Sequence, residues 1–184
     1  MSGFAVTSAT PVVFENSMVS LARVLGPALD EDVHQRFLAL GVDLRNPNPA
    51  YPYEVWVDAL TLALKVLWPG VPREEATYRL GRAIVTSFGD TGMGKALLGL
   101  VKVLGPHRAL ERMGRNLRTT NNYSETRLTP AGGNRYELWV NRVVFPDFFR
   151  GLVEAGLESG GATAPRVDLL SATPEGVVFA VEWR

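Results

Sequence analysis

The sequence predicts an α+β protein in which an N-terminal bundle of about six helices precedes a β-β-α-β-β antiparallel sheet. Up to residue 118, apolar side chains repeat with helical spacing, whereas from residue 122 they alternate with the period of a strand. Glycine and proline pairs separate the periodic segments. Helices that are segregated from strands in this way are expected to pack on one side of an antiparallel sheet.

The expected helices carry start and stop signals at their ends. Asp30 and the acidic residues after it suit a helix N-terminus, and Pro72 suits a first helical position. Gly105-Pro106 should end one helix and begin the next. Three prolines between Asn46 and Pro52 predict an irregular loop. The expected helices cover residues 17–25, 30–40, 53–68, 72–88, 96–104 and 106–113.

The last third of the chain predicts two hairpins with a helix between them. Residues 122–129 and 135–144 alternate around a turn at 130–134, and residues 167–171 and 177–181 alternate around Thr173-Pro174-Glu175-Gly176. Pro146 begins a helix whose apolar side ends at Gly160-Gly161. Residues 1–11 are expected to be a frayed N-terminal segment. Residues 12–184 should form one domain, with a helical part at 12–118 and a sheet part at 119–184.

Composition excludes several classes of function. The 19 Lys and Arg residues balance the 19 Asp and Glu residues, so no net field attracts nucleic acid or anionic membranes. There is no cysteine, which excludes thiol catalysis and cysteine-bound metals. No apolar run is long enough to insert in a membrane, and the N-terminus has no signal-peptide pattern. A cytoplasmic protein is expected.

Two local patterns each allow a functional and a structural interpretation. Gly89 to Lys95 has the spacing of a phosphate-binding loop, but Ala96 stands where a magnesium-binding hydroxyl is required, so a helix–helix turn is expected. Arginines at helical spacing could face an anionic partner or simply face solvent. These are Arg108, Arg112, Arg115 and Arg118. No catalytic triad, metal-ligand spacing or nucleophile elbow is found, so we expect no enzyme.

His107 is the one residue that could hold a cofactor. It follows Gly105-Pro106 at the start of an apolar-faced helix, where a neutral imidazole could enter a cavity and ligate haem iron. The structural alternative is a histidine at an interface or on the surface of a helix end. A single histidine without partner ligands does not decide between these interpretations.

The order of elements resembles the haem nitric-oxide/oxygen-binding (H-NOX) domain, over roughly residues 12–184. The resemblance implies the H-NOX-like fold and places His107 where that family carries its proximal histidine. The wider superfamily includes 4-vinyl reductase-type ligand domains and TRAPP vesicle-tethering subunits, which bind no haem. The segments that carry the resemblance are 37–41, 80–88, 106–113, 148–154 and the final hairpin.

One departure from the H-NOX pattern concerns the haem propionates. That family reads Tyr-x-Ser-x-Arg on the strand before the last helix, and the corresponding stretch is Leu138-Trp139-Val140-Asn141-Arg142, in which only Arg142 is kept. The segments 118–127, 136–139 and 150–157 are also similar to an uncharacterised protein family expanded in myxobacteria. The resemblance to that family implies the fold and supplies no activity.

These observations predict a haem-independent sensor, ligand-binding or protein-interaction module in bacterial signalling. Its partner would be an unknown protein or a small apolar ligand, with no cofactor and no metal. The alternative is a haem-based gas sensor in which His107 is the proximal iron ligand and Arg142 holds a propionate. The residues expected to line an apolar pocket are Val101, Leu104, Leu110, Met113, Leu138, Val140, Phe148 and Leu152.

Overall fold

The structure is a computed structural model that describes residues 10–90 and 92–184. Within these residues it contains a helical part, a small two-stranded sheet and a four-stranded antiparallel sheet, so the predicted α+β class is confirmed. The elements are β1 (Val12–Phe14), α1 (Glu15–Leu25), the 3-10 helix η1 (Gly26–Ala28), α2 (Glu31–Ala39), β2 (Ala50–Pro52), α3 (Tyr53–Leu67), α4 (Arg73–Gly89), α5 (Gly92–Glu111), α6 (Met113–Leu117), β3 (Thr126–Pro130), β4 (Arg135–Val140), α7 (Pro146–Ser159), β5 (Arg166–Thr173) and β6 (Gly176–Glu182).

The helices form where local signals place them. The side chain of Asp30 caps α2 by accepting a hydrogen bond from the backbone N–H of Val33 at 2.9 Å. Gly105 interrupts α5 with a φ of 79° and a ψ of 170°, so the chain changes direction at the predicted Gly105-Pro106 break. The expected frayed segment lies mostly at residues 1–9, outside the described part of the chain, and so does Thr91 of the expected helix–helix turn. That turn is shorter than expected, because α5 already begins at Gly92.

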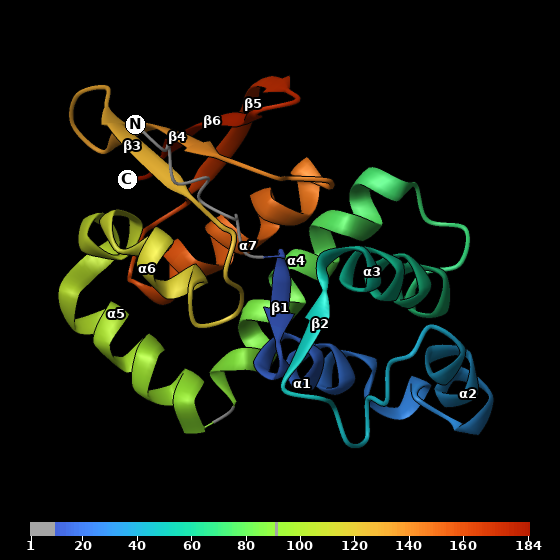
Figure 1. The fold of residues 1–184 in the computed structure, drawn as a ribbon. Helices are drawn as coiled ribbons and strands as arrows, with labels where there is room; N and C mark the ends of the chain where they lie inside the picture. The colour runs from blue at the N-terminus through green and yellow to red at the C-terminus, as the bar shows by residue number, and fades with distance from the viewer. Residues whose placement is uncertain (1–9, 91) are drawn as a thin grey trace, which may run out of the picture.

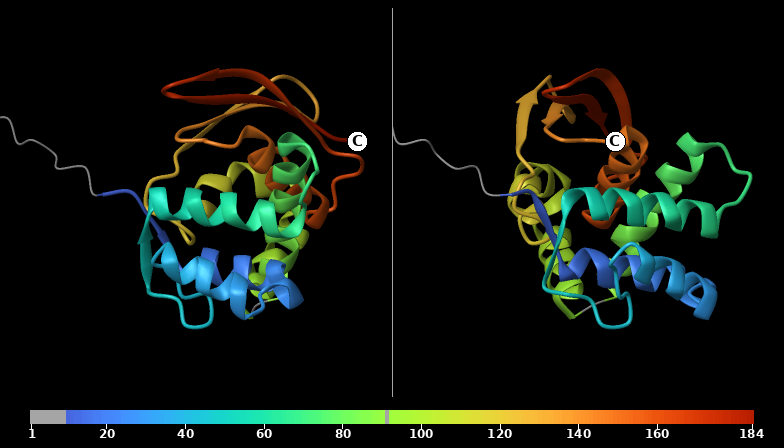
Figure 2. Two further views of the ribbon diagram at one scale, coloured as in Figure 1. Left: turned by 90° about the vertical axis from the view of Figure 1, so that its right-hand side faces the viewer. Right: turned by 45° about the vertical axis from the view of Figure 1, so that its right-hand side comes forward.

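The larger sheet has the strand order β3-β4-β6-β5, with antiparallel neighbours throughout. It covers one side of the helices, and α7 lies between it and the rest of the helical part (Figures 1 and 2). Its inner face carries Leu138, Phe179 and Val181, which are almost fully buried. The predicted β-β-α-β-β order is therefore confirmed.

Three expectations about strands are wrong. The strand expected at 122–129 begins only at Thr126, because the side chain of Asn121 accepts from the backbone N–H groups of Tyr123 and Ser124 and holds a turn there. The proline-rich stretch was expected to be irregular, yet Ala50–Pro52 forms β2, because it pairs with β1 and its proline stands at the last strand position. The strand expected at 135–144 ends at Val140. There Asn141 leaves the sheet, with its side chain accepting from the N–H of Glu125 and donating to the carbonyl of Tyr123.

Two groups of buried side chains form the core. One joins β1, β2 and helices α1 to α4, and the other joins the inner face of the four-stranded sheet to α7 and the end of α5. The helices α4 and α7 connect the two parts by a close crossing at Gly81 and Gly151. No helix in the described ranges has the length and apolar character that a bilayer-crossing helix needs.

Candidate functional site

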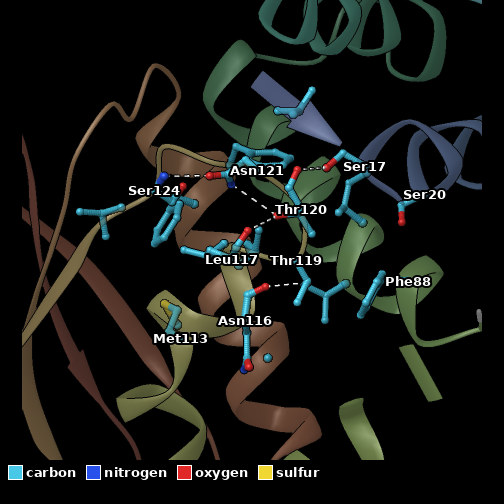
Figure 3. A pocket seen from close by; sticks show the side chains of 18 of the residues that line it. Ser17, Ser20, Phe88, Met113, Asn116, Leu117, Thr119, Thr120, Asn121 and Ser124 are labelled. Carbon is cyan, nitrogen blue, oxygen red and sulfur yellow. Dashed lines mark hydrogen bonds between the residues drawn. The ribbon is translucent and has the colours of Figure 1, made fainter. Parts of the chain in front are cut away.

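A cavity of about 220 Å³, partly open to solvent, lies where the two core groups meet. Helices α1, α3, α4, α5, α6 and α7 contribute to its wall, together with the segment 119–124 and the end of β4 (Figure 3). Most of the wall is aliphatic or aromatic. Its large apolar residues include Trp56, Leu60, Ile84, Phe88, Leu98, Val101, Leu110, Met113, Phe148, Phe149 and Leu152.

Polar side chains gather on one side of this cavity, mainly from residues 116–124 (Figure 3). The hydroxyl of Thr119 donates to the carbonyl of Asn116 at 2.7 Å, and that of Thr120 donates to Leu117 at 2.8 Å. From α1, the hydroxyl of Ser17 donates to the carbonyl of Thr120 at 3.3 Å. These hydroxyl groups already donate to protein carbonyls, so they are not available as donors to a polar ligand.

Two tyrosines close the cavity beside the end of β4. Tyr53 and Tyr123 meet edge to face, with ring centroids 4.9 Å apart, and the Tyr53 hydroxyl donates to the carbonyl of Arg142 at 2.9 Å. Burial raises the pKa of both phenols above the usual range. Both rings are therefore neutral at physiological pH, and this wall adds no negative charge.

The structure brings most of the candidate pocket residues together. Six of the eight line the cavity, namely Val101, Leu110, Met113, Val140, Phe148 and Leu152. Leu138 and Leu104 lie outside it. Leu138 is fully buried between the sheet and α7, because it stands in the middle of β4, where side chains of the second core group cover it.

His107 lies outside the cavity. Its side chain is 51% exposed, with Nε2 3.1 Å from Oε1 of Glu111. Its Nδ1 forms a hydrogen bond with the hydroxyl of Tyr136 on β4. Both ring nitrogens therefore have protein partners, and the imidazole packs beside the buried ring of Tyr136.

Arg142, the other residue considered for haem, does line the cavity. It follows β4, and its backbone has a φ of 47°, a left-handed conformation that is uncommon for a residue other than glycine. The hydrogen bond from Tyr53 fixes its carbonyl and so helps to hold this turn.

Several wall residues were not predicted from the sequence. The polar group at 116–124 and the pair Tyr53 and Tyr123 come from segments far apart in the chain. One signal was present, because residues 119–124 are five small polar residues and one tyrosine, placed between helix and strand. Among the described residues, no cluster of His, Cys, Asp and Glu has the arrangement of a metal site.

Comparison with solved structures identifies proteins that share this fold. An H-NOX protein mutant from K. algicida is similar with a TM-score of 0.68 and 11% identity, over 93% of this chain and 96% of that one. An oxygen-binding H-NOX domain related to soluble guanylate cyclases is similar with a TM-score of 0.64 and 13% identity, over 91% and 92% of the two chains. At these identities the likeness shows a shared fold.

Comparison by sequence is more specific. No curated protein matches the chain. The sequence profile of one family, described as protein of unknown function (DUF2378), matches residues 11–184. The chain therefore belongs to this family and has an H-NOX-like fold.

Proposed function

We propose that this protein is a haem-independent, non-enzymatic sensor module that binds a small apolar ligand in the cavity between its helices and its sheet. The apolar cavity of about 220 Å³ carries this proposal. One similar structure is described as an oxygen-binding H-NOX domain, so the fold accommodates a small ligand in at least one protein that shares it. The module would act in the cytoplasm and pass its state to a protein partner.

The size and chemistry of the cavity define the class of ligand. An apolar protein cavity of about 150 Å³ is large enough to bind benzene, and drug-sized ligands occupy about 300–1,000 Å³. A volume of about 220 Å³ suits an uncharged molecule of one or two small rings. Within the described part of the chain, the residues that line the cavity include no histidine and no carboxylate, which supports binding rather than acid–base catalysis.

The residues at the positions that the resemblance marks for haem do not fit that group. His107 is outside the cavity, with Nε2 against Glu111 and Nδ1 against Tyr136. The inner face of β4 presents Leu138 and Val140 where polar anchors for propionates would be needed. The cavity is also smaller than the range that drug-sized ligands occupy, and a porphyrin is no smaller than those ligands.

Filling the cavity tests the proposal. Gly156 lines it, and a Cβ at this position meets no heavy atom within 4 Å, so Gly156→Leu should place its side chain in the cavity. Gly99→Leu is a matched control, because Gly99 is an exposed helical glycine with equally open space around its Cβ. Toluene binding, measured by calorimetry and by the rise in melting temperature, should weaken at least about tenfold in Gly156→Leu and be unchanged in Gly99→Leu.

Each outcome of this experiment has a defined meaning. Equal loss of binding in both variants, or no toluene binding by the unaltered protein, would contradict the proposal. Thermal unfolding followed by circular dichroism checks that each variant is folded. Gly156→Ala, which adds a single methyl group to the same space, provides a milder variant and should weaken binding less.

The haem alternative predicts a different result. Protein produced with a haem precursor should show no stoichiometric Soret band, and His107→Gly should leave the spectrum unchanged. A stoichiometric Soret band that disappears in His107→Gly would instead support a gas sensor with His107 as the proximal ligand and Arg142 at a propionate. Absorption spectra of both proteins decide between the two functions.

A further inference from the structure

A second, polar hollow of about 450 Å³ lies on the surface between α6 and β3. Four arginines surround it, and its floor includes a buried serine and a half-buried threonine. Two glutamates also border it. The residues that line it are Glu111, Arg112, Gly114, Arg115, Arg118, Ser124, Glu125, Thr126 and Arg127.

The fold brings these arginines together from two separate segments. Arg112, Arg115 and Arg118 follow one another at helical spacing along α6 and its ends, whereas Arg127 comes from β3. Gly114 allows the approach, since a Cβ at this position would lie 2.5 Å from the hydroxyl oxygen of Thr126. The sequence pattern showed only the helical row, and the packing of α6 on β3 brings Arg127 to the border of the hollow, with its guanidinium over the ring of Trp139.

Arginines outnumber glutamates four to two around this hollow, and among the described residues no ion pair joins the two groups. Within the described residues, Arg112, Arg115 and Arg118 form no ion pair, and Arg127 lies over the ring of Trp139 at 4.2 Å from its centroid. Of the acidic neighbours, Glu111 is already in contact with His107 at 3.1 Å and with Arg108 at 3.9 Å. The whole chain is electrically neutral, so this concentration of arginine is local.

We propose that this hollow is a binding site for a soluble ligand that carries two or more linked phosphate groups. Guanidinium groups recognise phosphate oxygens by paired hydrogen bonds, and a hollow of about 450 Å³ that several arginines border has room for more than one phosphate. The hydroxyls of Ser124 and Thr126 are further donors at the floor. The volume lies within the range of small-molecule sites.

This site is independent of the proposed apolar ligand but adjacent to it. Ser124 borders both spaces, and α6 separates them, with Met113 and Leu117 lining the cavity and Arg115 lining the hollow. A phosphorylated ligand would therefore contact the helix that also forms a wall of the cavity. The tests of the two sites use different probes and different variants.

Inorganic triphosphate is the probe for the test. At low ionic strength, calorimetry should detect saturable binding, which Arg115→Ala/Arg118→Ala should weaken at least about tenfold. Arg108→Ala is the control for general charge, because Arg108 precedes the same helical row but does not line the hollow. It should change the affinity less than about threefold.

The outcomes distinguish a specific binding site from nonspecific attraction by positive charge. Loss of binding in the double variant alone supports the site. Equal weakening by Arg108→Ala, or no saturable binding of triphosphate, overturns it. Vesicles that contain a phosphoinositide serve as a second arm, and binding to them without binding to free triphosphate would also overturn the proposal of a soluble ligand. Because all three arginines of the alanine variants are at exposed positions, these variants should keep the fold, which circular dichroism verifies.

Discussion

Replacing Gly81 or Gly151 by alanine is expected to destabilise the protein by about 3 kcal/mol or more. A Cβ on Gly81 would lie 2.0 Å from the carbonyl oxygen of Phe148, and a Cβ on Gly151 would lie 2.2 Å from the carbonyl oxygen of Tyr78. Both obstacles are backbone atoms, so no side-chain rotation relieves the overlap. The helices α4 and α7 would have to move apart along their whole crossing.

Urea unfolding followed by circular dichroism measures this effect. Gly99→Ala is the control, because its Cβ meets nothing within 4 Å and alanine is the better helix former. It should stabilise the protein by about 0.5–1 kcal/mol. A loss below about 1 kcal/mol in both Gly81→Ala and Gly151→Ala would contradict the close crossing of α4 and α7.

Polar contacts near this crossing also join α4 and α7. Arg82 contacts Glu158 at 2.6 Å, and Tyr78 donates a hydrogen bond to Glu154. The other oxygen of Glu154 accepts from the backbone N–H of Val167 on β5 at 3.1 Å. Glu154 therefore links α4, α7 and the sheet edge. Burial, followed by the hydrogen bond to Glu154, raises the pKa of Tyr78, so the phenol keeps its proton at physiological pH.

The fold was predictable from sequence where the signals are local. The helix start at Asp30 and the break at Gly105-Pro106 depend on signals within a few residues, and both are present in the structure, where Asp30 is the cap. The pairing of Ala50–Pro52 with β1 was missed because it depends on a partner strand far away in the chain. Proline excludes a residue from the interior of a sheet, but it does not exclude a strand end.

The candidate site shows a different limit of sequence analysis. Leu138 and Val140 have the same side-chain direction on β4, yet only Val140 lines the cavity. The difference is that α7 covers Leu138. A hydrophobic pattern in the sequence does not show which helix covers which residue. The sequence places His107 after the Gly105-Pro106 break, where the structure has it. The direction of its side chain was not predictable, because Tyr136 on a distant strand holds the ring.

Phe179→Ala is expected to destabilise the protein by about 3–5 kcal/mol, the second of the two largest effects on stability. Phe179 is fully buried in the middle of β6, pairs with Leu138 on β4, and stacks on Phe149 of α7 with centroids 5.7 Å apart. Truncation leaves a cavity that the strands cannot close, since both neighbouring strands hold β6 in register. Leu170→Ala, at a side chain that is 54% exposed, should change stability by less than about 0.5 kcal/mol.

The same variant tests whether residues 12–184 unfold as one unit. Phe149 contacts the sheet and Gly151, two residues later, contacts α4, so α7 transmits loss of sheet packing to the helical part. Native-state hydrogen exchange should therefore show the same decrease in opening free energy for amides of β6 and of α3 in Phe179→Ala. A decrease confined to the sheet would contradict a single domain and assign the cavity to a boundary between two independently stable parts. In that case, a ligand between them would act by joining the two parts, and its binding would raise the stability of both.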